Sequence, residues 1–110
     1  MSGYAKGTRL EHAARHSLEA DGYRVIRSAG SKTKVDLIAL KPGELLFVQA
    51  KAGTGTASPA ERAELVALAS MVGARPILAL RRDRGPLEWW LLTGVGPKDR
   101  MRWTADWGLT

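Results

Sequence analysis

Three polar side chains at one end of a short apolar hairpin have types that suit metal-assisted chemistry. If residues 41–44 form a four-residue turn, the numbers of opposed residues sum to 85, and Asp36 faces Gln49 with Cβ atoms ~5 Å apart. Side chains alternate along a strand, so Lys51 lies on the same face as Gln49. A carboxylate beside an amide oxygen is a hard-oxygen site that suits Mg²⁺ or Mn²⁺. A nearby ammonium can orient or deprotonate a water and neutralise charge on a phosphate.

A second carboxylate is available from the segment before the hairpin, where Glu11 lies on a predicted helix. The alternative interpretation is an internal ion pair between Asp36 and Lys51 at a strand end, with Glu11 serving only to cap its helix. Spacing alone favours neither interpretation. Charged residues in an otherwise apolar hairpin nevertheless require an explanation, because burying them costs free energy.

Hydrophobic spacing and capping signals predict the elements that position these residues. A helix is expected over residues 8–21, opened by a Thr-x-x-Glu capping box at Thr8. A second is expected over residues 58–72, opened by the cap Ser58, by Pro59 and by a capping box with Glu61, and stopped by Gly73. Strands are expected over residues 23–27, 35–40, 45–51, 76–80 and 87–92. The order α-β-β-β-α-β-β predicts an α/β fold with a central mixed five-stranded sheet flanked by helices.

The length of 110 residues predicts a single domain over residues 1–110, with a core from about 6 to 94. The tail, residues 95–110, is expected to be irregular and to dock through Trp103 and Trp107. No apolar run approaches 18 residues and the first ten residues lack an apolar stretch, so we expect an intracellular, cytoplasmic and nucleoid-associated protein without a membrane partner.

Composition excludes several other classes of site. The chain has no cysteine, which excludes a disulfide scaffold, a Cys-ligated zinc site and a Cys nucleophile. The Gly- and Thr-rich segment 53–56 lacks the Gly-Lys-Ser/Thr of a nucleotide-binding loop, so no nucleotide cofactor is expected. Seventeen Lys and Arg against eleven acids give a net charge of +6, which favours a polyanionic partner such as nucleic acid. The alternative is a charge that serves solubility alone.

The residues around the hairpin resemble a known family. Glu11, Asp36 and the Gln-x-Lys that ends at Lys51 are similar to the site of the PD-(D/E)xK nuclease superfamily. More narrowly, the chain resembles the archaeal-type Holliday junction resolvases from about residue 6 to residue 80. The motifs that carry this resemblance are Lys6-Gly7, Glu11, Arg27-Ser28-Ala29-Gly30-Ser31, Val35-Asp36-Leu37-Ile38-Ala39 and Val48-Gln49-Ala50-Lys51.

This resemblance implies a PD-(D/E)xK-like fold and metal-dependent hydrolysis of DNA phosphodiesters at four-way junctions, with Mg²⁺ as the cofactor and Mn²⁺ as a substitute. It implies Glu11, Asp36 and Gln49 as metal ligands and Lys51 as the catalytic lysine. It also implies that Arg27 and Ser31 contact the backbone near the scissile phosphate. The other residues expected to contact DNA are Lys6, Arg9, His12, Lys32 and Lys34.

Two departures from the family pattern leave rival functions open. Gln49 stands where the family commonly has Glu, so the site loses one negative charge, and His12 stands where the family often has Arg. One rival is another nuclease of this fold that acts on duplex, flaps or ends. The other is a catalytically inactive module that holds branched DNA without cutting it.

The second predicted helix carries no charge from residue 65 to residue 72. A helix that is apolar on every side must be covered on every side. A homodimer would cover it, and the resemblance agrees; the predicted interface is Leu65, Leu68, Met71 and Val72. The alternative is that the Trp-rich tail covers this helix.

Overall fold

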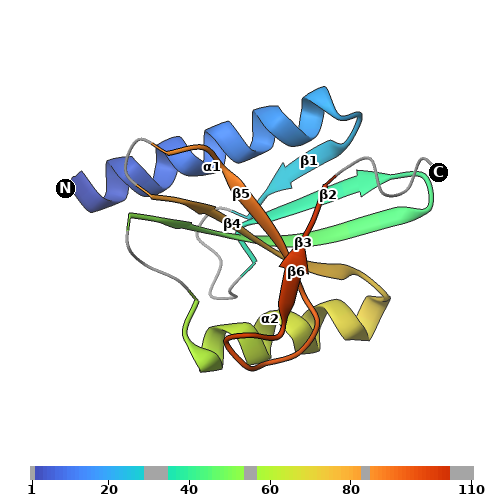
Figure 1. The fold of residues 1–110 in the computed structure, drawn as a ribbon. Coiled ribbons are helices and arrows are strands. Elements are labelled where there is room, and N and C mark those ends of the chain that lie inside the picture. The colour runs from blue at the N-terminus through green and yellow to red at the C-terminus, as the bar shows by residue number, and fades with distance from the viewer. Residues whose placement is uncertain (1, 29–34, 54–56, 83–84, 105–110) are drawn as a thin grey trace.

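The computed structural model describes residues 2–28, 35–53, 57–82 and 85–104, with the side chains of residues 2–8 left out. A six-stranded sheet is covered by one helix on each face (Figure 1). The elements are α1 (Ser2–Ala20), β1 (Arg24–Arg27), β2 (Leu37–Lys41), β3 (Glu44–Ala52), α2 (Pro59–Val72), β4 (Arg75–Arg81), β5 (Glu88–Leu92) and β6 (Arg100–Arg102).

The strands lie side by side in chain order, and the predicted mixed α/β class is confirmed. Every neighbouring pair is antiparallel except β3 and β4, which are parallel and joined by α2 as the crossover helix. Both faces of the sheet are covered, and the central strands β3 and β4 accordingly contain continuous apolar runs, residues 45–48 and 76–80, instead of alternating polar and apolar residues. No helix in the described part of the chain is long and apolar enough to cross a membrane.

Two separate cores lie on the two faces of the sheet. The core under α1 contains Leu18, Leu37, Val48 and Ile77, among others. The core under α2 contains Val35, Leu65, Leu78, Leu80 and Leu92. Because neighbouring residues of one strand point to opposite faces, Ile77 joins the first core and Leu78 the second.

The predicted register of the hairpin is confirmed. Leu40 lies opposite Leu45, and Ile38 lies opposite Phe47. The ladder ends at the pair of Leu37 with Val48, so Asp36, which precedes Leu37 in the chain, lies just beyond its end. At that point the Asp36 backbone N–H donates to the Val48 carbonyl at 2.8 Å.

The predicted start of α1 at Thr8 is wrong, because the helix already begins at Ser2. A Thr-x-x-Glu pattern caps a helix only where the preceding backbone leaves the helical region. No proline interrupts residues 2–7, and the helix continues through them. Glu11 therefore lies in the middle of α1, where its carboxylate is available for a contact outside the helix.

Helix α2 has the predicted ends. The Ser58 hydroxyl accepts from Glu61 N at 3.1 Å, and the Glu61 carboxylate accepts from Ser58 N at 2.9 Å. These two bonds form a complete capping box around Pro59. The helix ends at Gly73, whose φ of 71° is left-handed backbone that favours glycine.

A sixth strand replaces part of the tail expected to be irregular. Strand β6 pairs with β5 and has only three residues, Arg-Met-Arg, too few for a hydrophobic pattern to predict it. Trp103 follows β6 and is buried, with its ring centroid 6.3 Å from that of Tyr23 and 5.8 Å from that of Trp89. Trp107 lies outside the described residues.

The orientation of α2 corrects part of the predicted dimer interface. Leu65 is fully buried and faces the sheet, so it cannot contact another protomer. Trp103 packs under α1, so it does not cover α2 as the alternative required. Met71 and Val72 lie on the outer side of α2 with 78% and 57% of their surface exposed, and Leu68 is partly buried at the core's edge.

The capping box yields a prediction about stability. Ser58→Ala removes the acceptor for Glu61 N and is expected to lower the free energy of unfolding by about 1 kcal/mol, measured by equilibrium urea denaturation. Ser70→Ala, at an exposed site inside α2, is the matched control. It is expected to be neutral or slightly stabilising because Ala is the better helix former. Equal losses in the two variants would contradict the capping role.

Candidate active site

The Asp36 carboxylate lies where the β2–β3 ladder ends. Its Oδ2 atom accepts a hydrogen bond from the Ala50 backbone N–H at 2.8 Å. The side chain thus binds a β3 amide just beyond the last backbone pair of the two strands. Its other oxygen, Oδ1, has no hydrogen-bond partner among the described residues.

The surroundings of Asp36 mainly disfavour the ionised form of its carboxyl group. Burial raises the pKa of Asp36 above its usual value, and this is the largest effect. The Ala50 N–H and the Lys51 ammonium lower that pKa, while the carboxylates of Glu11 and Glu61 raise it. Lys51 and both glutamates are therefore within electrostatic reach of Asp36.

Gln49 carries an unusual buried acceptor. The residue is 3% exposed, and its Oε1 atom has no hydrogen-bond partner in the described part of the chain. Leaving a buried acceptor unpaired costs about 1–3 kcal/mol, so such an atom calls for an explanation. Strand alternation places Gln49 on the α2 face together with Phe47, whereas Val48 and Ala50 pack under α1. That orphaned oxygen is what a hard cation requires.

Lys51 is held by Glu61, for which the sequence pattern predicts only a role in the helix cap. Its Nζ atom lies 2.9 Å from Oε2 of Glu61, and both side chains are partly buried. Glu61 therefore uses one carboxylate oxygen for the capping box and the other for Lys51. The predicted alternative of a direct Asp36–Lys51 ion pair is wrong, because no described cation lies within ion-pair distance of Asp36.

Glu11 approaches the same end of the sheet from α1. Its Oε1 atom lies 2.8 Å from Nε of Arg27 on β1. This ion pair joins a predicted metal ligand to a predicted DNA contact. Among the described residues, no three His, Asp or Glu side chains are grouped closely enough to hold a metal ion.

The donor set nevertheless fits a divalent cation in part. The Asp36 carboxylate and the orphaned Gln49 oxygen are both hard ligands, and both belong to the same end of the hairpin. Glu11 uses Oε1 for Arg27, so its second carboxylate oxygen is the one that could serve as a third ligand.

The remaining residues predicted to contact DNA are only partly described. Arg9 and His12 are exposed on α1. Lys6 lies in α1, but its side chain is outside the described part, and so are Ser31, Lys32 and Lys34.

The class of protein follows from these positions. A mixed sheet between two helices carries an Asp at the start of one strand and a Gln-x-Lys on the next, which is the arrangement of PD-(D/E)xK nuclease-like folds. The profile of the family described as archaeal Holliday junction resolvase (Hjc) matches residues 2–106. The chain belongs to the archaeal Holliday junction resolvase family.

Two relatives agree with this assignment. The crossover junction endodeoxyribonuclease Hjc of Methanocaldococcus jannaschii is 37% identical over 81 residues, which are 71% of this chain and 60% of the relative. The structure of Archaeoglobus fulgidus Hjc, described as a Holliday junction resolvase from an archaeal hyperthermophile, matches with a TM-score of 0.67 and 29% identity. That match covers 76% of this chain and 70% of the other. The chain thus spans less than two thirds of the curated relative's length.

The raised pKa of Asp36 predicts how stability depends on pH. A carboxyl whose folded pKa exceeds its unfolded value, near 3.8, binds its proton more tightly in the folded state. Above the pKa of the folded state, ionisation of Asp36 therefore lowers the free energy of unfolding. This loss shrinks as the pH falls toward the pKa of the unfolded state and vanishes below it. We expect Asp36→Asn to raise the free energy of unfolding at pH 7 in metal-free buffer.

The same substitution should lose most of its advantage as the pH falls toward 3.8, because the wild-type carboxyl is protonated in the folded state and increasingly protonated in the unfolded state as well. Urea denaturation of both proteins from pH 7 to pH 4 measures this difference. A destabilised Asp36→Asn at pH 7, or a pH-independent gain, would contradict the assigned cost of the buried charge.

Proposed function

We propose that the protein is a structure-selective endonuclease that resolves four-way DNA junctions by metal-dependent hydrolysis of phosphodiester bonds. The observation that carries this proposal is the convergence of Asp36, Gln49 and Lys51 at one end of the β2–β3 hairpin. The family supplies the reaction, and the net charge of +6 suits a polyanionic substrate.

The residues that would hold the metal are Asp36 and Gln49, joined by Glu11 through the carboxylate oxygen that does not contact Arg27. The ion, Mg²⁺ with Mn²⁺ as a substitute, would acidify a bound water and polarise the phosphoryl group. Gln49 contributes a neutral oxygen, so the protein brings one negative charge fewer to the approaching phosphate.

Lys51 would contribute a positive charge to the reaction. Its Nζ atom can donate to a non-bridging phosphate oxygen and neutralise the charge that develops there. Glu61 holds that ammonium at 2.9 Å, which reduces the number of positions Lys51 can adopt before DNA arrives. Arg27 has a planar guanidinium whose shape matches a backbone phosphate.

One assay separates this proposal from its rivals. The purified protein is incubated with Mg²⁺ or Mn²⁺ and with a four-way junction, a flap, a duplex or single strands of matched sequence. Preferential cleavage of the junction supports the proposal, whereas equal cleavage of the duplex identifies another nuclease of this fold. Tight junction binding without cleavage in either metal identifies the inactive module.

Lys51→Ala and Asp36→Ala are each expected to reduce junction cleavage by a factor of hundreds, with junction affinity nearly unchanged. The reason is that these groups act mainly on the transition state, whereas affinity rests on many phosphate contacts. Single-turnover cleavage and equilibrium binding, measured separately, test this split. Lys41→Ala, at the far end of the same hairpin, is the matched control and should cut as wild type does. Wild-type cleavage by Lys51→Ala would mean that the site is misplaced.

The proposal includes a homodimer formed through the outer side of α2. Met71 and Val72 are exposed there, and Leu68 lies at its edge. A C₂ dimer presents two identical sites, which suits a four-way junction because that substrate has an approximate two-fold axis. Burying adjacent apolar side chains between two protomers would remove a surface that a monomer leaves in water.

Val72→Arg is expected to convert the dimer to a monomer at micromolar concentration, because it places two like charges near the two-fold axis. Light scattering measures the mass, and a cruciform plasmid reports whether the two cuts stay paired. Leu40→Arg, an exposed apolar residue on β2, is the control for the added charge. A wild-type protein that scatters as a single chain would contradict the proposed dimer.

A further inference from the structure

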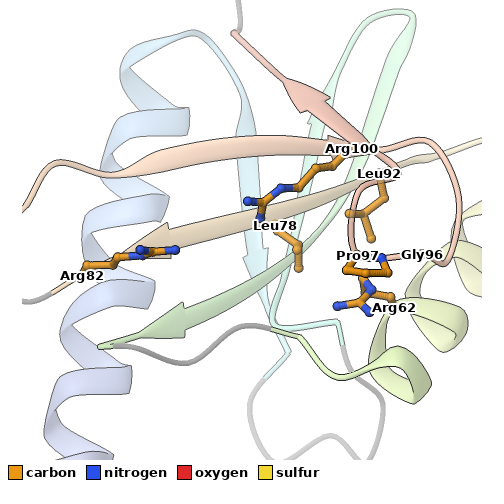
Figure 2. A pocket seen from close by; sticks show the side chains of 7 residues that line it. All are labelled: Arg62, Leu78, Arg82, Leu92, Gly96, Pro97 and Arg100. Atoms are coloured by element: carbon orange, nitrogen blue, oxygen red, sulfur yellow. The ribbon is translucent and has the colours of Figure 1, made fainter.

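A cationic cavity of about 180 Å³ lies on the α2 face of the sheet, outside the candidate active site (Figure 2). Its floor is formed by Leu78 of β4 and Leu92 of β5, and the loop before β6 forms one wall. The charged residues that line it are Arg62, Arg82 and Arg100, and the described lining includes no acid. Three guanidinium groups around one cavity suit an anion.

Arg62 is built into this cavity. It is 6% exposed although arginine is a residue type that is seldom fully buried without a partner. Its Nε atom donates to the Val95 carbonyl at 2.8 Å, and Nη1 donates to the Ala57 carbonyl. These neutral acceptors satisfy hydrogen bonds but not the charge, and within the described residues Arg62 makes no ion pair. A buried, unneutralised charge is costly unless a counter-ion binds beside it.

The other two arginines approach from opposite sides. Figure 2 shows the Arg82 and Arg100 side chains reaching toward each other across the cavity. Arg100 is held on the ring of Trp90, with its Cζ atom 4.1 Å from the ring centroid, which limits its freedom before a ligand arrives. Arg82 is exposed at the end of β4, and the described residues give it no ion pair.

Among the residues that the structure describes, the acids nearest in sequence to the cavity's walls are already engaged. Asp99 accepts from Gly96 N at 3.0 Å, and Glu88 accepts from Nε1 of Trp90 at 3.3 Å. Glu61 is bound to Lys51 and to Ser58. Within the described part of the chain, these acids therefore do not neutralise the three arginines.

The cavity and the candidate active site lie on the same face of the sheet, on neighbouring strands. Leu78 is the register neighbour of Gln49, so one strand spacing of ~4.8 Å separates the cavity floor from the orphaned amide. Glu61 and Arg62 are consecutive in α2, and Arg81 lies opposite Ala52, next to Lys51. This separation is on the order of one to two nucleotide steps, at ~3.4 Å of axis per step.

We propose that this cavity binds a second phosphodiester of the DNA backbone, outside the bond that is cleaved, through the guanidinium groups of Arg62, Arg82 and Arg100. The inference rests on the proposed function, because it extends the same DNA path along the α2 face. Planar guanidinium forks match phosphate oxygens in pairs, so the cavity would set the register of the strand relative to Asp36 and Lys51.

The first test compares Arg82→Gln and Arg100→Gln with Arg75→Gln, which removes the same charge at the opposite end of β4. Junction affinity is measured in metal-free buffer over a range of salt concentrations. Each cavity variant is expected to bind about tenfold more weakly and to lower the slope of log K against log[salt] by about one. Arg62 is left intact because its bonds hold the loop before β6. Cavity variants that bind as Arg75→Gln does would overturn the proposal.

The second test identifies the source of the phosphate. A single neutral methylphosphonate is moved along the junction arms, and binding is measured at each position. With wild type, one position outside the scissile phosphate should weaken binding about tenfold, and with Arg82→Gln/Arg100→Gln that position should lose its effect. Unchanged interference in the double variant would overturn the proposal. A second result would also overturn it: inorganic phosphate stabilises wild type but not the double variant, while both proteins bind DNA equally well. The cavity would then bind a free anion and not the DNA backbone.

The wild-type reference separates this inference from the proposed function. If wild type cuts junctions and the cavity variants bind as it does, the second phosphate site alone is wrong. If wild type neither binds nor cuts branched DNA, the proposed function is wrong and this inference with it.

Discussion

The hydrogen bond from the Ala50 N–H to the Asp36 carboxylate is the contact on which the site depends. It lies where the β2–β3 ladder stops, so a side chain instead of a carbonyl joins the two strands there. This bond turns the Asp36 carboxylate toward β3 and fixes Gln49 and Lys51 relative to it. The same arrangement buries a carboxylate, and burial raises the pKa of Asp36. The protein thus accepts a cost in stability at the position where its chemistry is proposed.

Local patterns predicted the parts of the fold that depend on local physics. The hairpin register follows from a short turn and strict alternation, and a slip of one residue would have sent Asp36 to the other face. Ser58 and Gly73 mark the ends of α2 because their chemistry satisfies the terminal backbone groups of that helix. The start of α1 was mispredicted because a cap signal at Thr8 does not require the preceding backbone to leave the helix. The three residues of β6 form a strand only because β5 is already in place.

The candidate site was predicted in its residue types but not in its contacts. Which acid binds Lys51 depends on how α2 lies over the sheet, and no periodicity in the sequence reports that angle. Glu61 therefore stood out only as a cap, although its second oxygen holds the ammonium. The same tertiary placement buries Leu65 and leaves Val72 exposed within one uncharged segment. Arg62 reads as a solvated helix residue, and only the loop before β6 makes it part of a cavity wall.

The charges around the candidate active site explain why a neutral residue is tolerated at position 49. Glu11 is paired with Arg27 and Glu61 with Lys51, so Asp36 is the unneutralised acid of the described site. A carboxylate at position 49 would add a second negative charge beside Asp36, whose pKa is already raised by burial and by two other acids. Gln49 avoids this repulsion and keeps an oxygen ligand, at the cost of an unpaired buried acceptor. The cationic cavity one strand away carries the opposite charge, because three arginines line it. A divalent cation would pair with the Asp36 carboxylate and the Gln49 oxygen, and the phosphates of a DNA strand would pair with the arginines of the cavity.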